Sequence, residues 1–121
     1  MPPAKVNLDD AFASFAEQWS PRIAARVNED YSLKIGKVEG EFVWHKHDET
    51  DELFMVHKGK LTIRFRDGDV TLEAGELLVV PRGVEHCPVA DMEAEILLLE
   101  PTETRNTGDV ESERTVAARD L

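Results

Sequence analysis

The sequence predicts an all-β domain of the sandwich or barrel kind, preceded by one short helix. From residue 22 onward, short apolar runs are separated by turn residues at intervals of about 8 to 12 residues, as in sandwiches and barrels. Before residue 21, apolar residues recur at helical spacing instead. The 121 residues suffice for one domain but not for two hydrophobic cores. We therefore expect a helical segment over 1–20, a barrel over 21–101 and a tail over 102–121.

The N-terminal helix is predicted over residues 8–19. Asn7 is a suitable N-cap because its side-chain oxygen can accept a hydrogen bond from the first turn, and Pro21 is expected to end the helix. Four apolar residues recur at i, i+4, i+7 and i+11 and share one helical face: Leu8, Phe12, Phe15 and Trp19. We expect this stripe to pack against the sheet, and an aromatic platform for a ligand is the alternative.

The remaining apolar runs predict nine strands, separated by turns that contain Gly, Pro, Asn or Asp. Their expected ranges are 22–27, 31–39, 41–47, 52–57, 60–66, 69–73, 76–80, 86–90 and 93–100. After Pro101 apolar residues become rare, so the tail is predicted to be mobile or to form an arm over a neighbouring subunit, with little contribution to the core.

Some of these strands carry more apolar residues than a barrel interior can bury. The ranges 52–57, 76–80 and 93–99 are apolar on both faces, so one face is expected to line the barrel while the other faces outward. Exposed apolar surface of that extent is rare in a monomer. The sequence therefore predicts a homodimer joined through outer strand faces.

Charge and composition exclude several classes of protein. The net charge of −11, from 14 basic and 25 acidic residues, makes a nucleic acid an unfavourable partner. Cys87 is the only cysteine, which rules out an intramolecular disulfide and a sulfur-rich metal site. No apolar run approaches the length of a membrane span, and the N-terminus lacks the apolar core of a secretory signal. We expect a cytoplasmic protein without a membrane partner.

Three histidines and one glutamate are spaced so that they can meet at one metal ion. His45 and His47 lie two apart in a predicted strand and so share a face. Glu52 begins the next strand after a short polar connection, and His86 follows a turn. Three imidazoles and one carboxylate suit Fe(II), Mn, Ni, Co or Zn and leave positions open for substrate. His-x-His pairs also occur by chance, and an isolated histidine is usually structural.

The surrounding glycines and proline extend this pattern to two longer motifs. They read Gly40-x4-His45-x-His47-x4-Glu52-x6-Gly59 and Gly75-x5-Pro81-x-Gly83-x2-His86. With these motifs the chain resembles the cupin superfamily over roughly residues 31–100. The resemblance implies a double-stranded β-helix (jelly-roll) barrel and a metal ion held by the three histidines and the glutamate. One departure is Ala90, where the family often has asparagine at a position that is not a ligand.

Within that superfamily, the chain is most similar to small single-domain bacterial cupins labelled mannose-6-phosphate-isomerase-like. The label reports similarity of the barrel and is weak support for sugar isomerisation, because one fold hosts many chemistries. Two nearby groups are predicted to point away from the site by strand alternation: His57, five residues after Glu52, and Cys87, next to His86. An acidic loop over 48–51 could supply a general base, although solvated loop charges are the commoner case.

Two functions are consistent with these residues. The first is a metal-dependent enzyme that acts on a small, oxygen-rich organic molecule by oxygenation, isomerisation or lyase chemistry. Three neutral imidazoles, one carboxylate and a divalent ion carry a net charge of +1, which favours an anionic bidentate ligand. The alternative is a non-catalytic cupin that binds a metal or small ligand for sensing or storage. Both have a small molecule as partner.

Overall fold

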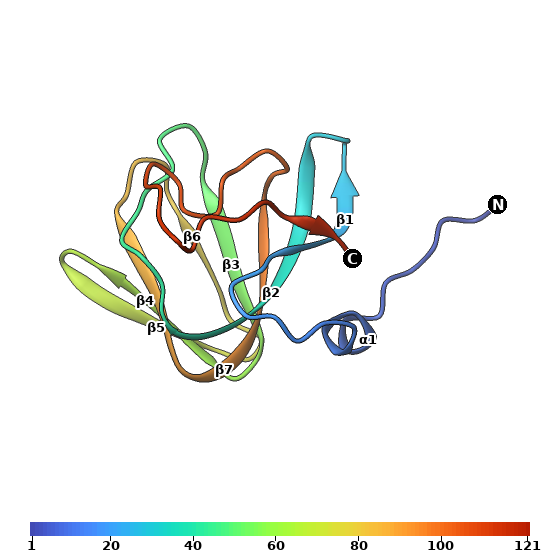
Figure 1. The fold of residues 1–121 in the computed structure, drawn as a ribbon, viewed down its shortest axis with the longest axis horizontal. Helices are drawn as coiled ribbons and strands as arrows, with labels where there is room; N and C mark the ends of the chain where they lie inside the picture. The colour runs from blue at the N-terminus through green and yellow to red at the C-terminus, as the bar shows by residue number, and fades with distance from the viewer.

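A computed structural model describes all residues, 1–121, as a barrel of mostly antiparallel strands with one short helix on its side (Figure 1). The elements are α1 (Leu8–Ala13), β1 (Arg22–Val27), β2 (Tyr31–Glu41), β3 (Glu52–Lys58), β4 (Lys60–Phe65), β5 (Gly68–Glu73), β6 (Leu77–Val80), β7 (His86–Pro101) and β8 (Arg119–Asp120). The predicted class, all-β with a short N-terminal helix, is confirmed. No helix has the length and apolar character needed to cross a membrane.

The long strand β7 organises the barrel. Its first part, His86–Val89, pairs with β4, and its later part, Glu95–Leu99, pairs with β3. On its other edge β7 pairs with β2 along most of its length, and the sheet continues to β1. The strand order is β5-β4-β7-β2-β1-β8, with β3 bridging β7 and β6. The first residues of β3 and β7, Glu52 and His86, are two of the predicted metal ligands.

The main hydrophobic core fills the barrel interior. In β3 the buried residues alternate with less buried ones, and β4 repeats the pattern, so each strand turns one face inward. The ten core residues are Val38, Phe54, Val56, Leu61, Ile63, Leu72, Val80, Ala90, Ala94 and Ile96. Fully burying one such aliphatic or aromatic side chain contributes about 1.5–3 kcal/mol, so this core holds the barrel together.

The predicted helix over 8–19 is wrong in its extent, because α1 ends at Ala13. Asn7 caps its start as expected, and its side chain accepts a hydrogen bond from Asp10 N at 2.9 Å. Beyond the helix the chain turns to follow β2, and Trp19 N donates to Lys37 O at 2.8 Å. Trp19 has a positive φ of 55° and stacks on Phe42, so it packs on the barrel and not in a helical stripe. Hydrogen bonding to β2 therefore outweighs the tendency of residues 14–19 to continue the helix.

The other end of the stripe packs as predicted. Phe12 and Phe15 are buried against Ile35 and Leu97 in a second, smaller core between α1 and the outer side of the sheet. Their ring centroids are 6.4 Å apart. This part of the stripe, Phe12 and Phe15, is therefore a packing surface and not an aromatic platform for a ligand.

Two of the predicted strands differ from the structure. Residues 41–47 do not form a strand after β2 ends, and only His45 makes a single bridge there, to His86. The predicted strands 86–90 and 93–100 are instead one continuous strand, β7. Asp91 and Met92, which lie between the two predicted strands, are exposed on β7, and the pairing with β2 shifts its register opposite them. The gap between the predicted strands thus marks an irregularity in the strand pairing and not a chain reversal.

The tail after Pro101 lies on its own barrel (Figure 1). Its last strand, β8, pairs in parallel with β1, and Arg114 donates to Glu41 O at 3.1 Å. Thr107 is fully buried. Neither apolar core includes a residue after Pro101, so the tail adds little to the core, as predicted. The prediction of a mobile segment or an arm on a neighbouring subunit is wrong, because backbone hydrogen bonds hold the tail to its own chain.

An apolar surface remains on the outside of β6, β3 and β7. Leu77 is 56% exposed and Val79 is 44% exposed. The pairing registers place Val79 and Leu99 on either side of Leu53, and Leu77 beside Met55, so these side chains form one outer patch. This is the excess apolar surface on which the predicted homodimer depends.

We expect the protein to be a homodimer at micromolar concentration, with this outer patch in the interface. Light scattering should give twice the chain mass of 13.6 kDa. Leu77→Glu should shift the mass to that of one chain, because it places a charge within a buried interface. Val70→Glu, at an exposed apolar residue of β5, is the control and should leave the dimer intact. A monomeric mass for the unmodified protein would contradict the prediction.

Candidate metal centre

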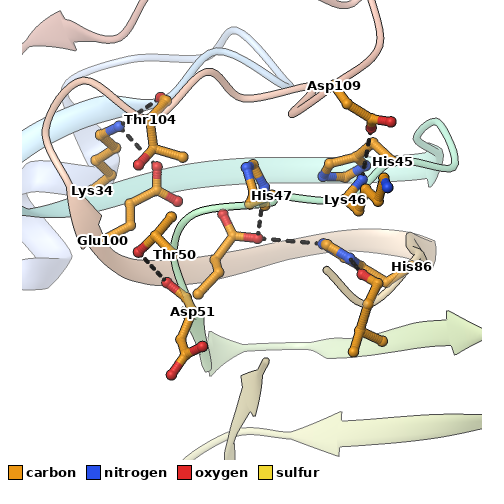
Figure 2. Close-up of polar contacts among 12 residues, drawn as sticks. Lys34, His45, Lys46, His47, Thr50, Asp51, His86, Glu100, Thr104 and Asp109 are labelled. Carbon is orange, nitrogen blue, oxygen red and sulfur yellow. Dashed lines mark hydrogen bonds and ion pairs between the residues drawn. The ribbon is translucent and has the colours of Figure 1, made fainter. Parts of the chain in front are cut away.

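The four predicted ligands are brought together from three separate parts of the chain. His45 and His47 lie in the segment between β2 and β3, Glu52 begins β3 and His86 begins β7. All four are buried, and one ligand atom from each lies within 4.8 Å of the others. Figure 2 shows the rings of His47 and His86 approaching one carboxylate from two sides, which is that of Glu52. This group could hold one metal ion.

Backbone hydrogen bonds set the positions of these side chains. His45 N donates to His86 O at 3.0 Å, and His86 N donates to His45 O at 2.9 Å. These two hydrogen bonds hold the two segments side by side. Gly83 N donates to His47 O at 2.8 Å and ties the turn before β7 to the second histidine. Gly83 has φ +78°, in the left-handed region that glycine adopts without strain. The turn residues of the sequence motif therefore position the ligands.

Hydrogen bonds orient two of the imidazoles for metal binding. The Nδ1 atoms of His45 and His86 lie 2.8 Å from Val43 O and 2.9 Å from Val84 O. A carbonyl oxygen only accepts, so each Nδ1 carries the proton and donates. The Nε2 atom is then the one that can bind a metal, an arrangement common among metal-bound histidines.

Several atoms that face one another in this group have no hydrogen-bond partner. Nε2 of His47 and Nε2 of His86 lie 3.3 and 3.4 Å from Glu52 Oε1, and all three atoms are buried without a hydrogen bond. Unpartnered buried polar atoms are uncommon, because each costs about 1–3 kcal/mol. A divalent ion among them would remove this cost. The residues present therefore fit a metal.

The protonation states also suit a metal. Burial, reinforced by the neighbouring His86, lowers the pKa of His45 to about 4, so this ring is neutral near pH 7. Burial alone would raise the pKa of Glu52, but the Glu100 carboxyl and the rings of His47 and His86 hold it well below its ordinary value. A neutral imidazole and an ionised carboxylate are the forms that bind divalent ions.

The group opens onto a pocket inside the barrel. His45 and Glu52 form part of its wall. Most of the remaining wall is apolar and comes from the core strands and the loops at one end: Trp19, Pro21, Val38, Phe42, Phe54, Pro88, Ile96 and Leu98. Thr104, Asn106 and Ala118 of the tail complete the lining. Apolar walls with a few polar groups are typical of small-molecule sites.

The tail also contacts the segment that contains His45 and His47 directly. Lys46 N donates to Asp109 Oδ1 at 2.9 Å, and Asp109 N donates to Lys46 O at 3.0 Å. Gly108 packs so closely that a Cβ atom there would overlap Lys46 O and approach the His45 ring. This contact was not predictable from the sequence, because Gly108 looks like an ordinary loop glycine.

Replacing Gly108 with Ala is therefore expected to release the tail from the barrel. Gly108 has φ +58°, so the substitution adds backbone strain to the overlap with Lys46. Hydrogen exchange of the amides in residues 102–121 should become faster. Gly75→Ala is the control, since Gly75 has a similar φ of +86° but open space around it. Unchanged exchange in Gly108→Ala would contradict the expected clash.

A second polar pair in the pocket was not singled out from the sequence. Lys34 of β2 donates to Glu100 Oε2 of β7 at 2.9 Å, and both side chains are 2% exposed. Burial and the nearby Glu52 carboxyl raise the pKa of Glu100 well above its ordinary value, while Lys34 opposes this shift. Strand alternation could have identified this pair from the sequence. Lys34 lies four residues before the inward-facing Val38, and Glu100 lies four residues after the inward-facing Ile96, so both side chains also face inward.

Other candidate residues lie elsewhere. His57 faces away from the metal group, as predicted, and its Nε2 is 2.9 Å from Asp9 Oδ1. Cys87 is fully buried, and burial raises the pKa of its thiol, as expected for an inert cysteine. In the acidic loop, Asp51 Oδ1 accepts a hydrogen bond from Arg82 N at 2.9 Å, and Asp48 pairs with Lys46 at 3.2 Å. These two carboxylates therefore have structural partners.

Comparison with known proteins agrees with this fold. The cupin domain family matches residues 32–100, and the chain belongs to that family. A crystal structure of a cupin-2 domain containing protein from Shewanella frigidimarina is 53% identical, with a TM-score of 0.78. The similarity covers 79% of this chain and 93% of that one.

Two curated relatives match over shorter stretches. "Uncharacterized protein YdbB" of Bacillus subtilis is 38% identical over 58 residues, which are 47% of this chain and 51% of the relative. "Putative dioxygenase SSO1533" of Saccharolobus solfataricus is 28% identical over 81 residues, 65% of this chain and 21% of the relative. The chain thus spans about half of the first relative and about a fifth of the second.

Proposed function

We propose that this cupin is a metal-dependent enzyme that acts on a small, oxygen-rich organic molecule. His45, His47, Glu52 and His86 are the proposed ligands of one divalent ion. The observation that carries the proposal is the set of buried, unpartnered nitrogen and oxygen atoms that face one another at the wall of an apolar pocket. Such atoms have no evident purpose in a purely structural barrel.

Each part of the site has a role in this proposal. A bound divalent ion supplies Lewis acidity or a centre for oxygen activation. The three imidazoles and the carboxylate hold the net charge at +1, which favours an anionic chelating group on the substrate. The apolar wall formed by residues such as Phe42, Phe54 and Ile96 excludes water and leaves the substrate few polar partners.

Among the reaction classes, oxygenation is the one we favour over isomerisation and lyase chemistry. Oxygenation is supported by the similarity to the Saccharolobus protein that is named "Putative dioxygenase SSO1533". The donor set is compatible with Fe(II), the usual metal of non-haem oxygenases, and equally with Mn, Ni, Co or Zn. The metal therefore has to be identified by experiment.

The test combines metal analysis with an oxygen-uptake screen. The purified protein is analysed for metal, stripped, and reloaded in turn with Fe(II), Mn, Ni, Co and Zn. Oxygen uptake is then measured with catechols, diketones and thiols. We expect uptake that depends on Fe(II) and is absent from His86→Ala. Absence of oxygen uptake with every metal and substrate would contradict oxygenation. If every substrate were also recovered unchanged, the result would contradict the enzyme and favour the alternative, a non-catalytic metal-binding or ligand-binding cupin.

The carboxylate ligand has its own expected effect. Glu52→Gln should weaken metal binding by about tenfold or more without abolishing it, because three imidazoles remain and the amide oxygen is a neutral donor. Replacing a residue that hydrogen-bonds to a metal ligand already costs about 10–100-fold in metal affinity. Competition against a metal-sensitive dye measures the affinity. Unchanged affinity in Glu52→Gln would remove this residue from the proposed ligand set.

A further inference from the structure

The pocket contains a second polar pair beside the candidate metal ligands, and neither member of that pair is itself a candidate ligand. Lys34 and Glu100 line the same pocket as His45 and Glu52. Figure 2 shows Lys34, Glu100 and Thr104 gathered on one side of the imidazole rings. The pair thus lies next to the place where a metal-bound molecule would sit.

Both members of the pair have hydrogen-bonding capacity left over. Lys34 Nζ donates to Glu100 Oε2 at 2.9 Å and to Thr104 O at 3.3 Å, which accounts for two of its three protons. Glu100 Oε1 is buried and no N–H or hydroxyl donor of the protein reaches it, although the Glu52 carboxyl lies beside the Glu100 carboxyl. One spare donor and one spare acceptor therefore lie close together in an otherwise apolar part of the pocket.

Stability alone does not account for this pair. Burying polar or charged side chains is costly, and well-packed apolar residues in place of a buried Lys–Glu pair are often as stable or more so. The surrounding wall, including Ile96 and Leu98, is apolar and would accommodate such residues. A role in binding explains why both a lysine and a glutamate are retained there.

We infer that Lys34 and Glu100 form a recognition site for a hydroxyl group of the substrate. This inference rests on the proposed function, since the same molecule would bind the metal through a chelating group. A hydroxyl is the smallest group that can accept from Lys34 Nζ and donate to Glu100 Oε1 at once. A second carboxylate on the substrate has no proton to donate to Glu100 Oε1. A methyl group would leave both Lys34 Nζ and Glu100 Oε1 without a partner. The substrate class is therefore a hydroxylated chelator, such as a polyhydroxy acid.

Matched pairs of small hydroxy acids test this site. Lactate and glycerate share the same chelating group and differ by one hydroxyl on the third carbon. The acids 2-hydroxybutyrate and 2,4-dihydroxybutyrate repeat the comparison one carbon further out. Binding is measured by calorimetry to protein loaded with one Zn²⁺ or Co²⁺ per chain. In at least one pair, we expect the additional hydroxyl to tighten binding by about tenfold or more, as for a hydrogen bond to a charged group.

The variants separate the hydroxyl site from the metal site. Lys34→Met/Glu100→Leu removes both polar groups together, so neither is left unpaired, and at saturating metal it should abolish the hydroxyl preference while still holding one ion per chain. The control is Lys60→Met/Glu73→Leu, which removes an exposed Lys–Glu pair between β4 and β5 and should keep the preference. If the first double variant does not fold, Glu100→Gln replaces it, because the amide removes the carboxylate and keeps the shape.

Each outcome bears on a different claim. Equal affinity within both pairs of acids, or no binding of any acid to metal-loaded protein, would overturn the hydroxyl site. A preference that survives in Lys34→Met/Glu100→Leu would overturn it too. Loss of metal from that variant would show that the pair acts by positioning Glu52, which also contradicts the inference. Failure of the unmodified protein to hold any divalent ion would instead contradict the proposed function.

Discussion

Replacing His86 with Ala is expected to abolish stoichiometric metal binding while the β-rich fold remains. The His86 ring is fully buried, and its unpartnered Nε2 faces Glu52 Oε1. Loss of this imidazole leaves two imidazoles and one carboxylate around an enlarged space. Elemental analysis of the purified variant should find far less than one ion per chain, and circular dichroism should still show strands. His47→Ala should behave in the same way.

The matched control for this prediction is His57→Ala. This variant also removes one imidazole from the barrel, but His57 lies outside the metal group, where it pairs with Asp9 and stacks on Phe12. It should keep a full complement of metal. Full metal occupancy in His86→Ala or His47→Ala would show that the ligand assignment is wrong.

Phe12→Ala is expected to lower the free energy of unfolding by about 3–5 kcal/mol. Phe12 is 1% exposed and packs in the small core under α1, with its ring 5.3 Å from that of His57 and parallel to it within 8°. Truncation leaves a cavity that a helix of only six residues is poorly able to close. Urea denaturation followed by circular dichroism measures the loss.

Val6→Ala is the control for that measurement. Val6 is an exposed apolar residue just before α1, so its truncation should change the free energy of unfolding by no more than about 0.5 kcal/mol. A loss below about 1 kcal/mol in Phe12→Ala would mean that α1 contributes little to the stability of the barrel. A large loss in both variants would point instead to the N-terminal segment as a whole.

Much of the candidate site was predictable from residue types and spacing. The two motifs name all four candidate ligands, and the structure brings His45, His47, Glu52 and His86 together. Spacing sufficed to name the candidate ligands because each motif has its own local geometry: a tight turn with Gly83 precedes His86, and Glu52 opens a strand. Backbone hydrogen bonds between the two segments then bring the motifs together. Spacing also predicts the inward parity of β3 and β4, since side chains of a strand alternate whatever the fold.

Other features depended on contacts between distant parts of the chain. The helical period of residues 8–19 was real, yet α1 ends at Ala13 because the next residues gain more by pairing with β2 than by continuing the helix. The tail shows no apolar pattern, and its docking depends on hydrogen bonds between Asp109 and Lys46, far apart in sequence. Local propensity does not include such pairings.

The Lys34–Glu100 pair illustrates the same division at the site itself. Alternation along each strand determines that Lys34 and Glu100 point inward. Only the register of β2 against β7, which pairs Lys34 with Leu98 and Ser32 with Glu100, brings the ammonium within 2.9 Å of the carboxylate. The sequence by itself thus determined the fold class, the four candidate ligands and the direction of the side chains. The tertiary structure decided which inward charges meet, because strand register is set by packing of the whole barrel.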